Sequence, residues 1–176
     1  MKAHWIYFKY VAKHKWYVFL ECCKLGVPWL GIIHDWHKFT PVEWFPYVHY
    51  FYAKDGSKKQ ITDKTGYYKP DDTGDGAFDR AWFYHQKRAR HHWQSWAYPD
   101  TNGELKLMEM PVKHAKEMLA DWYGAAQAQG KKRDSVMDWY REHRNDMMLH
   151  PLTRDWIQRA LFDVDNANDI WLYMPK

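Results

Sequence analysis

The N-terminal segment puts the strongest constraint on the fold. KAHWIYFKYVAKHKWYVFLECCK is aromatic enough to suggest a membrane span, but Lys9, Lys15 and Glu21 are among the charges that interrupt it. Charges at this density do not enter a bilayer core. The segment therefore predicts a long aromatic-rich helix over residues 2–25 in a soluble protein, with Gly26 as the C-terminal stop.

Proline and glycine divide the rest of the chain into shorter helices. Pro28 suits the first turn of a second helix, which carries HDWHK. Thr40 and Glu43 have the spacing of a capping box and open a third helix, which we expect to kink or restart near Pro46. A turn signal at 99–104 between β-like runs indicates a hairpin. Four later helices are predicted over residues 77–90, 111–129, 134–144 and 151–162.

These signals predict a mostly α fold of about six to seven helices with one small β-hairpin. One polar segment interrupts the pattern, because residues 54–76 are rich in glycine, lysine and aspartate. Loops of this length are usually functional, so we expect a mobile insertion over a cleft within a single domain at 1–176. The tail at 163–176 contains the apolar run IWLYMP, which we expect to dock on the rest of the protein.

Composition narrows the function classes. The chain has 176 residues and a formal net charge of +4, which fits an anionic substrate or a nucleic acid without selecting between them. Its two cysteines, Cys22 and Cys23, are adjacent, which disfavours a disulfide and indicates a reducing compartment. No cysteine-based metal motif, phosphate-binding loop or GxSxG turn occurs. We expect a cytoplasmic protein with no membrane partner.

Histidine and aspartate residues form the candidate site. The stretch GIIHDWHKF places His34 and Asp35 side by side after an apolar run, and other candidates lie on separate predicted helices. Imidazole and carboxylate ligands without a thiolate suit Mn, Fe, Co, Ni or Zn, and helices can bring such ligands together in a bundle. We predict one or two divalent transition metals, Fe or Mn first and Zn, Co or Ni as alternatives. The candidate ligands are His14, His34, Asp35, His85, His91, His92 and Asp121.

The remaining histidines are predicted not to bind metal. A single histidine on a helix more often makes a hydrogen bond than a metal bond. His37 would point away from the helix face shared by His34 and Lys38. The other residues assigned to this class are His4, His49, His114, His143 and His150.

Basic residues lie near the candidate ligands. Lys38 follows His34 by four residues, so on a helix its ammonium would face a phosphate held at the metals. Lys87, Arg88 and Arg90 form a basic run beside aromatic residues. In an enzyme this run would attract a polyphosphate to the site, whereas in a binding protein it would grip nucleic acid.

The order of these residues resembles the HD-domain superfamily of metal-dependent phosphohydrolases. The likeness is greatest to its HD-GYP branch, through HDWHK at 34–38, HH at 91–92 and ADWYGA at 120–125. WQSWAYP stands where that branch has GYP, the separate histidine before HH is the nearby His85, and YGA replaces YDA. The whole chain also resembles a group of small proteins found largely in phage genomes, which would place it in the cytoplasm of an infected bacterium.

The resemblance implies an HD-type helical bundle and roles for individual residues. Asp35 would bridge two metal ions, and Lys38 would contact phosphate, so these two would be catalytic. The implied activity is hydrolysis of a nucleotide or a signalling oligonucleotide by metal-activated water. The other implied ligands are His14, His34, Asp121 and one or both of His91 and His92.

Two further functions fit the same sequence. The HD superfamily also contains di-iron oxygenases that use O₂ to cleave C–C or C–P bonds, and O₂ uptake would distinguish them from hydrolases. Alternatively, the HD residues are structural, and the basic segment at 87–90 binds nucleic acid with steeply salt-dependent affinity and no turnover.

Overall fold

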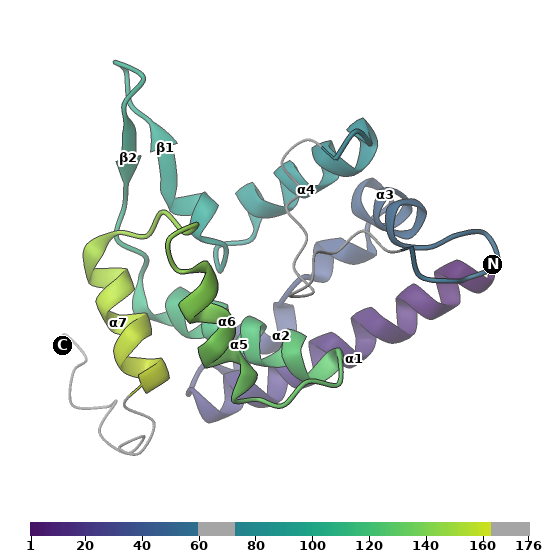
Figure 1. Cartoon of the computed structure of the whole chain (residues 1–176), viewed down its shortest axis with the longest axis horizontal. Helices are drawn as coiled ribbons and strands as arrows, with labels where there is room; N and C mark the ends of the chain where they lie inside the picture. The colour runs from purple at the N-terminus through teal and green to yellow at the C-terminus, as the bar shows by residue number, and fades with distance from the viewer. Residues whose placement is uncertain (60–72, 163–176) are drawn as a thin grey trace.

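The computed structural model describes residues 1–59 and 73–162. Over these residues it has seven α-helices and one two-stranded antiparallel hairpin, which confirms the predicted mostly α fold (Figure 1). Most of the expected mobile loop and all of the expected docked tail lie outside the described residues. The helices are α1 (Lys2–Lys24), α2 (Pro28–Ile33), α3 (Pro41–Phe51), α4 (Gly76–Arg88), α5 (Val112–Ala128), α6 (Ser135–His143) and α7 (Pro151–Phe162).

The longest helix, α1, packs along α5 in the most extensive helix–helix contact. Gly124 of α5 makes this approach possible, because an added Cβ there would lie 2.5 Å from Val18 Cγ2 and 2.8 Å from the Val18 backbone nitrogen. The buried residues of α1 recur every three or four positions, as the inner side of a helix requires. They are Ala3, Tyr7, Val11, His14, Val18, Glu21 and Cys22.

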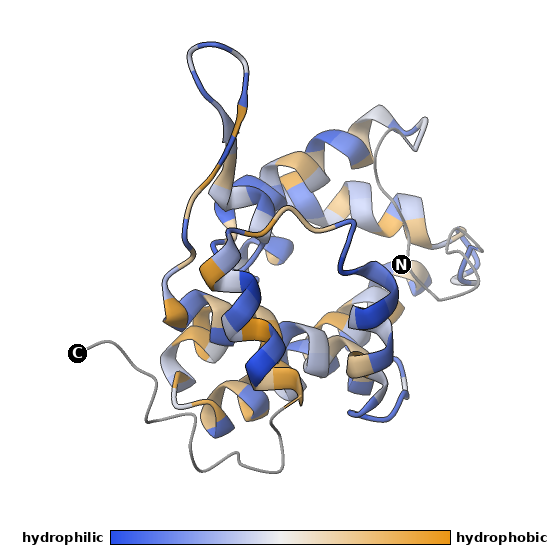
Figure 2. Ribbon diagram, turned by 60° about the vertical axis from the view of Figure 1, so that its left-hand side comes forward, coloured by the Kyte–Doolittle hydropathy of each residue, from blue (hydrophilic) through white to orange (hydrophobic). Residues whose placement is uncertain are grey.

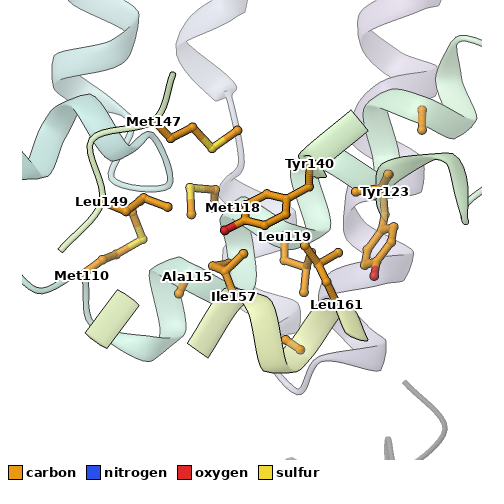
Figure 3. Packing of buried hydrophobic residues seen from close by; sticks show 13 residues of the cluster. Met110, Ala115, Met118, Leu119, Tyr123, Tyr140, Met147, Leu149, Ile157 and Leu161 are labelled. Atoms are coloured by element: carbon orange, nitrogen blue, oxygen red, sulfur yellow. The ribbon is translucent and has the colours of Figure 1, made fainter. Parts of the chain in front are cut away.

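Apolar side chains gather in separate clusters on either side of the middle of α1. One cluster joins α5, α6 and α7, where Met118, Tyr140 and Ile157 are fully buried (Figure 3). Another joins the N-terminal half of α1 to α3 and α4 through residues such as Tyr47 and Phe78. A third, small cluster lies at the α1–α5 contact and contains Val18, Cys22 and Ala120.

The hairpin projects away from the helices (Figure 2). It pairs β1 (Ala97–Pro99) with β2 (Leu105–Leu107), with Ala97 opposite Leu107. Two short 3-10 helices also occur, η1 (Trp36–Phe39) and η2 (Trp93–Trp96). Within the described ranges, none of the helices combines the length and apolar character that crossing a bilayer would need.

Two local expectations were wrong. HDWHK does not continue a second helix, because α2 ends at Ile33 and η1 begins at Trp36. The capping box is not formed either, since the Thr40 hydroxyl donates to the His37 carbonyl (2.7 Å) and makes no cap contact. At Pro46 the sequence predicted a kink or a restart, and the restart does not occur because α3 runs through this residue as one helix.

Candidate metal centre

His14 enters the centre from the inner side of α1. Its neighbours one turn away, Val11 and Val18, are buried in different apolar clusters, so the histidine lies between them. Its Nε2 is 3.1 Å from Asp121 Oδ1 on α5 and 3.8 Å from Asp35 Oδ2. The close α1–α5 contact therefore brings together ligands that are far apart in the sequence.

A sharp turn after α2 directs both residues of the HD pair inward. Asp35 has a φ of 51°, in the left-handed region that non-glycine residues rarely adopt. The ammonium of Lys15 on α1 donates to the carbonyl of His34, the residue that follows α2. This contact supports the turn, and His34 and Asp35 are both almost completely buried as a result.

Four residues form the first ligand group: His14, His34, Asp35 and Asp121. Each offers one ligand atom, and these atoms lie within 4.8 Å of one another. His34 Nε2 is 3.4 Å from Asp35 Oδ2 and 3.3 Å from Asp121 Oδ1. Two carboxylates and two imidazoles around one point match the ligand preferences of a divalent transition metal.

Three histidines form the second ligand group: His85, His91 and His92. His85 lies near the C-terminus of α4, and the other two follow in the turn before η2. Helix α4 ends at Arg88, short of the predicted Arg90, so the turn and not a shared helix face brings the histidines together. The other oxygen of Asp35, Oδ1, lies 3.6 Å from His85 Nε2 and 3.4 Å from His91 Nε2. Asp35 thus stands between the two groups, with one oxygen toward each.

Two buried glutamates contact the Nδ1 atoms of imidazole rings whose Nε2 atoms belong to the ligand groups. Glu117 Oε1 lies 3.2 Å from Nδ1 of His34 and 3.2 Å from Nδ1 of His91. Glu43 accepts a hydrogen bond from Nδ1 of His85 at 2.9 Å. An ionised carboxylate can only accept, so these contacts place a hydrogen on Nδ1 and direct Nε2 of each ring toward the ligand groups.

Neither glutamate was predicted as part of the site. Glu43 has the sequence position of a helix cap, and its contact with His85 spans 42 residues. Glu117 did carry a signal, because it precedes Asp121 by four residues on one face of α5. Burial alone would raise the pKa of Glu43, but hydrogen bonds from His37 and His85 outweigh it and lower the pKa to about 2.

The charge state differs between the two groups. Burial alone would lower the pKa of His34, but Asp35, Asp121 and Glu117 outweigh it and raise the pKa to about 10. For His85, burial dominates over the nearby carboxylates and lowers the pKa to about 4. The first group therefore gathers charged residues, and the second presents a neutral imidazole.

Several buried polar atoms at the centre lack a hydrogen bond. A buried polar group without a partner costs about 1–3 kcal/mol, so such a group of atoms indicates a ligand. All of them belong to the two ligand groups, which fits a bound cation. They are Asp35 Oδ1, His91 Nε2 and His92 Nε2.

A cavity of about 490 Å³ opens onto both ligand groups. Lys38 lines it, and its Nζ lies 2.5 Å from Asp35 Oδ2. Three indoles from different elements, Trp82, Trp93 and Trp122, form part of the wall. Lys131, after α5, also lines the cavity and was not predicted as a site residue.

The predicted basic run does not line this cavity. Lys87 donates to the main-chain carbonyls of Gln94 (3.0 Å) and Ala97 (3.3 Å), so it supports the segment around η2. Arg88 lies over the ring of Tyr84, with 5.2 Å between guanidinium carbon and ring centroid. Arg90 is exposed. A substrate contact for these three cations stays a prediction.

The histidines predicted not to bind metal have varied surroundings. His37 is buried, with Nδ1 3.3 Å from the Glu43 carboxylate, and it also lies close enough to Asp35 and His85 to share a metal with them. His37 takes this position because it lies on η1, after the turn at Asp35, and not on the helix predicted for HDWHK. The other five belong to none of the candidate ligand groups in the described chain. These five are His4, His49, His114, His143 and His150.

Comparison with known proteins assigns the chain to a family. The model of a family of unknown function, DUF5662, matches residues 3–163, which include every residue of both ligand groups. The chain therefore belongs to this family. Neither the curated proteins nor the solved structures gave a match.

Proposed function

We propose that this member of the family is an HD-type metal-dependent phosphohydrolase whose substrate is a nucleotide. The observation that carries the proposal is the arrangement around Asp35, whose two buried oxygens face different sets of imidazole Nε2 atoms. Divalent metals held there would supply Lewis acidity and lower the pKa of a nearby water.

Lys38 is the residue best placed to bind the phosphate. Burial alone would lower the pKa of its ammonium, but Asp35 outweighs burial and raises the pKa, so Lys38 stays charged at physiological pH. It lies on the cavity wall beside the first ligand group. There its charge would offset the negative charge that grows on the phosphoryl oxygens.

The remainder of the cavity supports an aromatic organic phosphate as the substrate. Its volume of about 490 Å³ lies within the range of small-molecule sites. Trp82, Trp93 and Trp122 offer ring faces and edges against which a planar base can pack. A nucleotide suits this lining, with its phosphate at Lys38 and its base against the indoles.

The test is a hydrolysis assay with Mn²⁺, Fe²⁺ or Co²⁺ added to the purified chain. The substrates are bis(4-nitrophenyl) phosphate and a panel of nucleoside mono- and triphosphates and cyclic nucleotides. We expect metal-dependent turnover that Asp35→Asn abolishes and that Asp155→Asn, an exposed control on α7, leaves intact. The absence of turnover with every metal and substrate would contradict the proposal.

The same protein preparation tests the other candidate functions. O₂ consumption by the Fe²⁺-loaded chain, without phosphate release, would identify an oxygenase. Salt-dependent binding of nucleic acid without turnover would identify a binding protein.

A further inference from the structure

Among the described residues, the most exposed tryptophans all lie in the first 36 positions of the chain. Trp5, Trp16, Trp29 and Trp36 are 58–66% exposed. All other tryptophans in the described ranges are partly buried. Large apolar patches on a protein surface mark sites where another molecule binds.

These residues form one surface, which we call the aromatic face. On α1, Trp5 stacks on Phe8 with 5.6 Å between ring centroids, and Phe8 meets Phe39 of η1 at 6.4 Å. Further along α1, Trp16 lies 5.9 Å from Phe19, against which Gly31 of α2 packs. The aromatic face comprises Trp5, Phe8, Trp16, Trp29, Ile32, Ile33, Trp36 and Phe39.

Within residues 1–53, the exposed charged side chains are all basic. Residues 1–53 contain three acidic side chains, Glu21, Asp35 and Glu43, and all three are buried. Lys9 and Lys13 are exposed on α1 and make no ion pair with any described residue. Lys9 lies over the ring of Trp5 at 5.8 Å. The face is therefore apolar with a cationic edge.

We propose that the aromatic face docks on an anionic lipid surface. Tryptophan and phenylalanine are suited to the boundary between headgroups and acyl chains, where their rings enter the apolar layer. Lysines at the edge would reach back to acidic headgroups along their apolar stems. Such binding lies along the membrane plane and needs no spanning helix, and it departs from the expectation that the protein has no membrane partner.

The charge pattern favours lipid over two other occupants. In a symmetric dimer the same surface forms both sides of the interface, so it would contain Lys9 and Lys13 of both copies and no exposed carboxylate from residues 1–53. A nucleic acid would pair with the lysines and stack on the rings, but Ile32 and Ile33 would gain nothing from phosphates. Acyl chains accommodate these isoleucines.

Docking in this way leaves the metal centre accessible. Trp16 points outward from α1, whereas His14 and Val18 point inward toward α5. The aromatic face and the ligand groups thus lie on different sides of the same helix. This inference is independent of the proposed hydrolase activity.

Vesicle flotation of the full chain tests the inference, with phosphatidylcholine vesicles compared with vesicles that also contain phosphatidylserine. We expect binding to the acidic vesicles that weakens as salt rises. The double variant Lys9→Gln/Lys13→Gln should weaken it about 25-fold, or about fivefold for each lysine. The control Lys106→Gln/Lys113→Gln removes two exposed lysines elsewhere and should change it little. Trp16→Ser/Trp36→Ser should weaken binding about tenfold for each tryptophan.

Three results would overturn the inference. The first is no flotation with acidic vesicles, and the second is equal loss in the two lysine variants. The third is a different occupant of the aromatic face. This would be seen as a dimer in sedimentation velocity that the variant Trp16→Ser/Trp36→Ser dissociates, or as binding of single-stranded RNA through the same residues without binding of vesicles. Circular dichroism melting of each variant separates these outcomes from unfolding.

Discussion

The two ligand groups share Asp35 but differ in charge. The first combines two imidazoles with two carboxylates, and the pKa of His34 is raised to about 10 by its acidic surroundings. The second consists of three histidines, and burial lowers the pKa of His85 to about 4. Two of the four side chains in the first group are carboxylates, which attract a cation, whereas the second group offers three imidazoles beside one oxygen of Asp35. We infer that a divalent metal fills the first group before the second.

Removal of the shared residue gives the largest expected effect. In Asp35→Ala both groups lose an oxygen ligand, so we expect almost no bound metal after desalting. Asp155→Ala, which removes an exposed carboxylate on α7, should retain wild-type metal content. Full metal content in Asp35→Ala, measured by inductively coupled plasma mass spectrometry, would show that Asp35 does not join the groups.

A substitution at the α1–α5 contact should damage the first group selectively. Gly124→Ala places a Cβ against Val18, one turn from His14, and such overpacking costs about 1–3 kcal/mol. We expect a lower free energy of unfolding and weaker metal binding by the first group. Gly76→Ala, at a glycine with open space around it, is the control. Equal urea midpoints for both variants would contradict the packing argument.

Loss of the Lys38 ammonium should separate phosphate binding from metal binding. Lys38→Met removes the cation beside Asp35 Oδ2, so metal affinity should be kept or increased. Binding of inorganic phosphate to the metal-loaded chain should weaken by about 1.5–3 kcal/mol, the usual contribution of a charged hydrogen bond. Isothermal titration measures both. Unchanged phosphate affinity would remove Lys38 from the proposed substrate site.

Substitution of the two glutamates that contact Nδ1 atoms should change the metal affinity of the two ligand groups unequally. Glu117→Gln changes the partner of both His34 and His91, one in each group. Glu43→Gln changes the partner of His85 and should weaken the second group alone. Loss of such supporting contacts typically costs about 10- to 100-fold in metal affinity. If both variants gave the same two-step metal-binding curve, the two glutamates would not support the ligand groups differently.

Much of the fold could be predicted because proline and glycine mark its helix boundaries. Gly26, Pro28, Pro41 and Pro151 each lie at or beside a helix end in the structure. These signals act over a few residues, so a sequence displays them directly. The left-handed Asp35 could not be predicted in this way, because the contact that supports the turn comes from Lys15 on another helix.

The clustering of the candidate ligands was easier to predict than the residues that contact them from behind. His14, His34, Asp35 and Asp121 were predicted as ligands, and the structure brings them together in the first group. Glu43 was assigned to a helix cap because the local capping rule gave no sign of a histidine 42 residues away. Long-range partners of this kind depend on tertiary packing.

One departure from the HD-GYP pattern has a packing explanation. The sequence has YGA where that branch has YDA, and the residue concerned is Gly124. No larger side chain fits there against Val18 while α1 and α5 keep their spacing. The motif alone could not show this, because it contains no information on the opposing helix.

Metal stoichiometry of the wild-type chain tests the central claim most directly. The chain, purified without chelators and dialysed against increasing Mn²⁺, would be analysed for bound metal by mass spectrometry. The structure predicts filling in two steps, to two ions per chain, with the first ion lost in His14→Ala and the second in His91→Ala. A wild-type chain that binds no ion, or binds one that neither substitution affects, would contradict it.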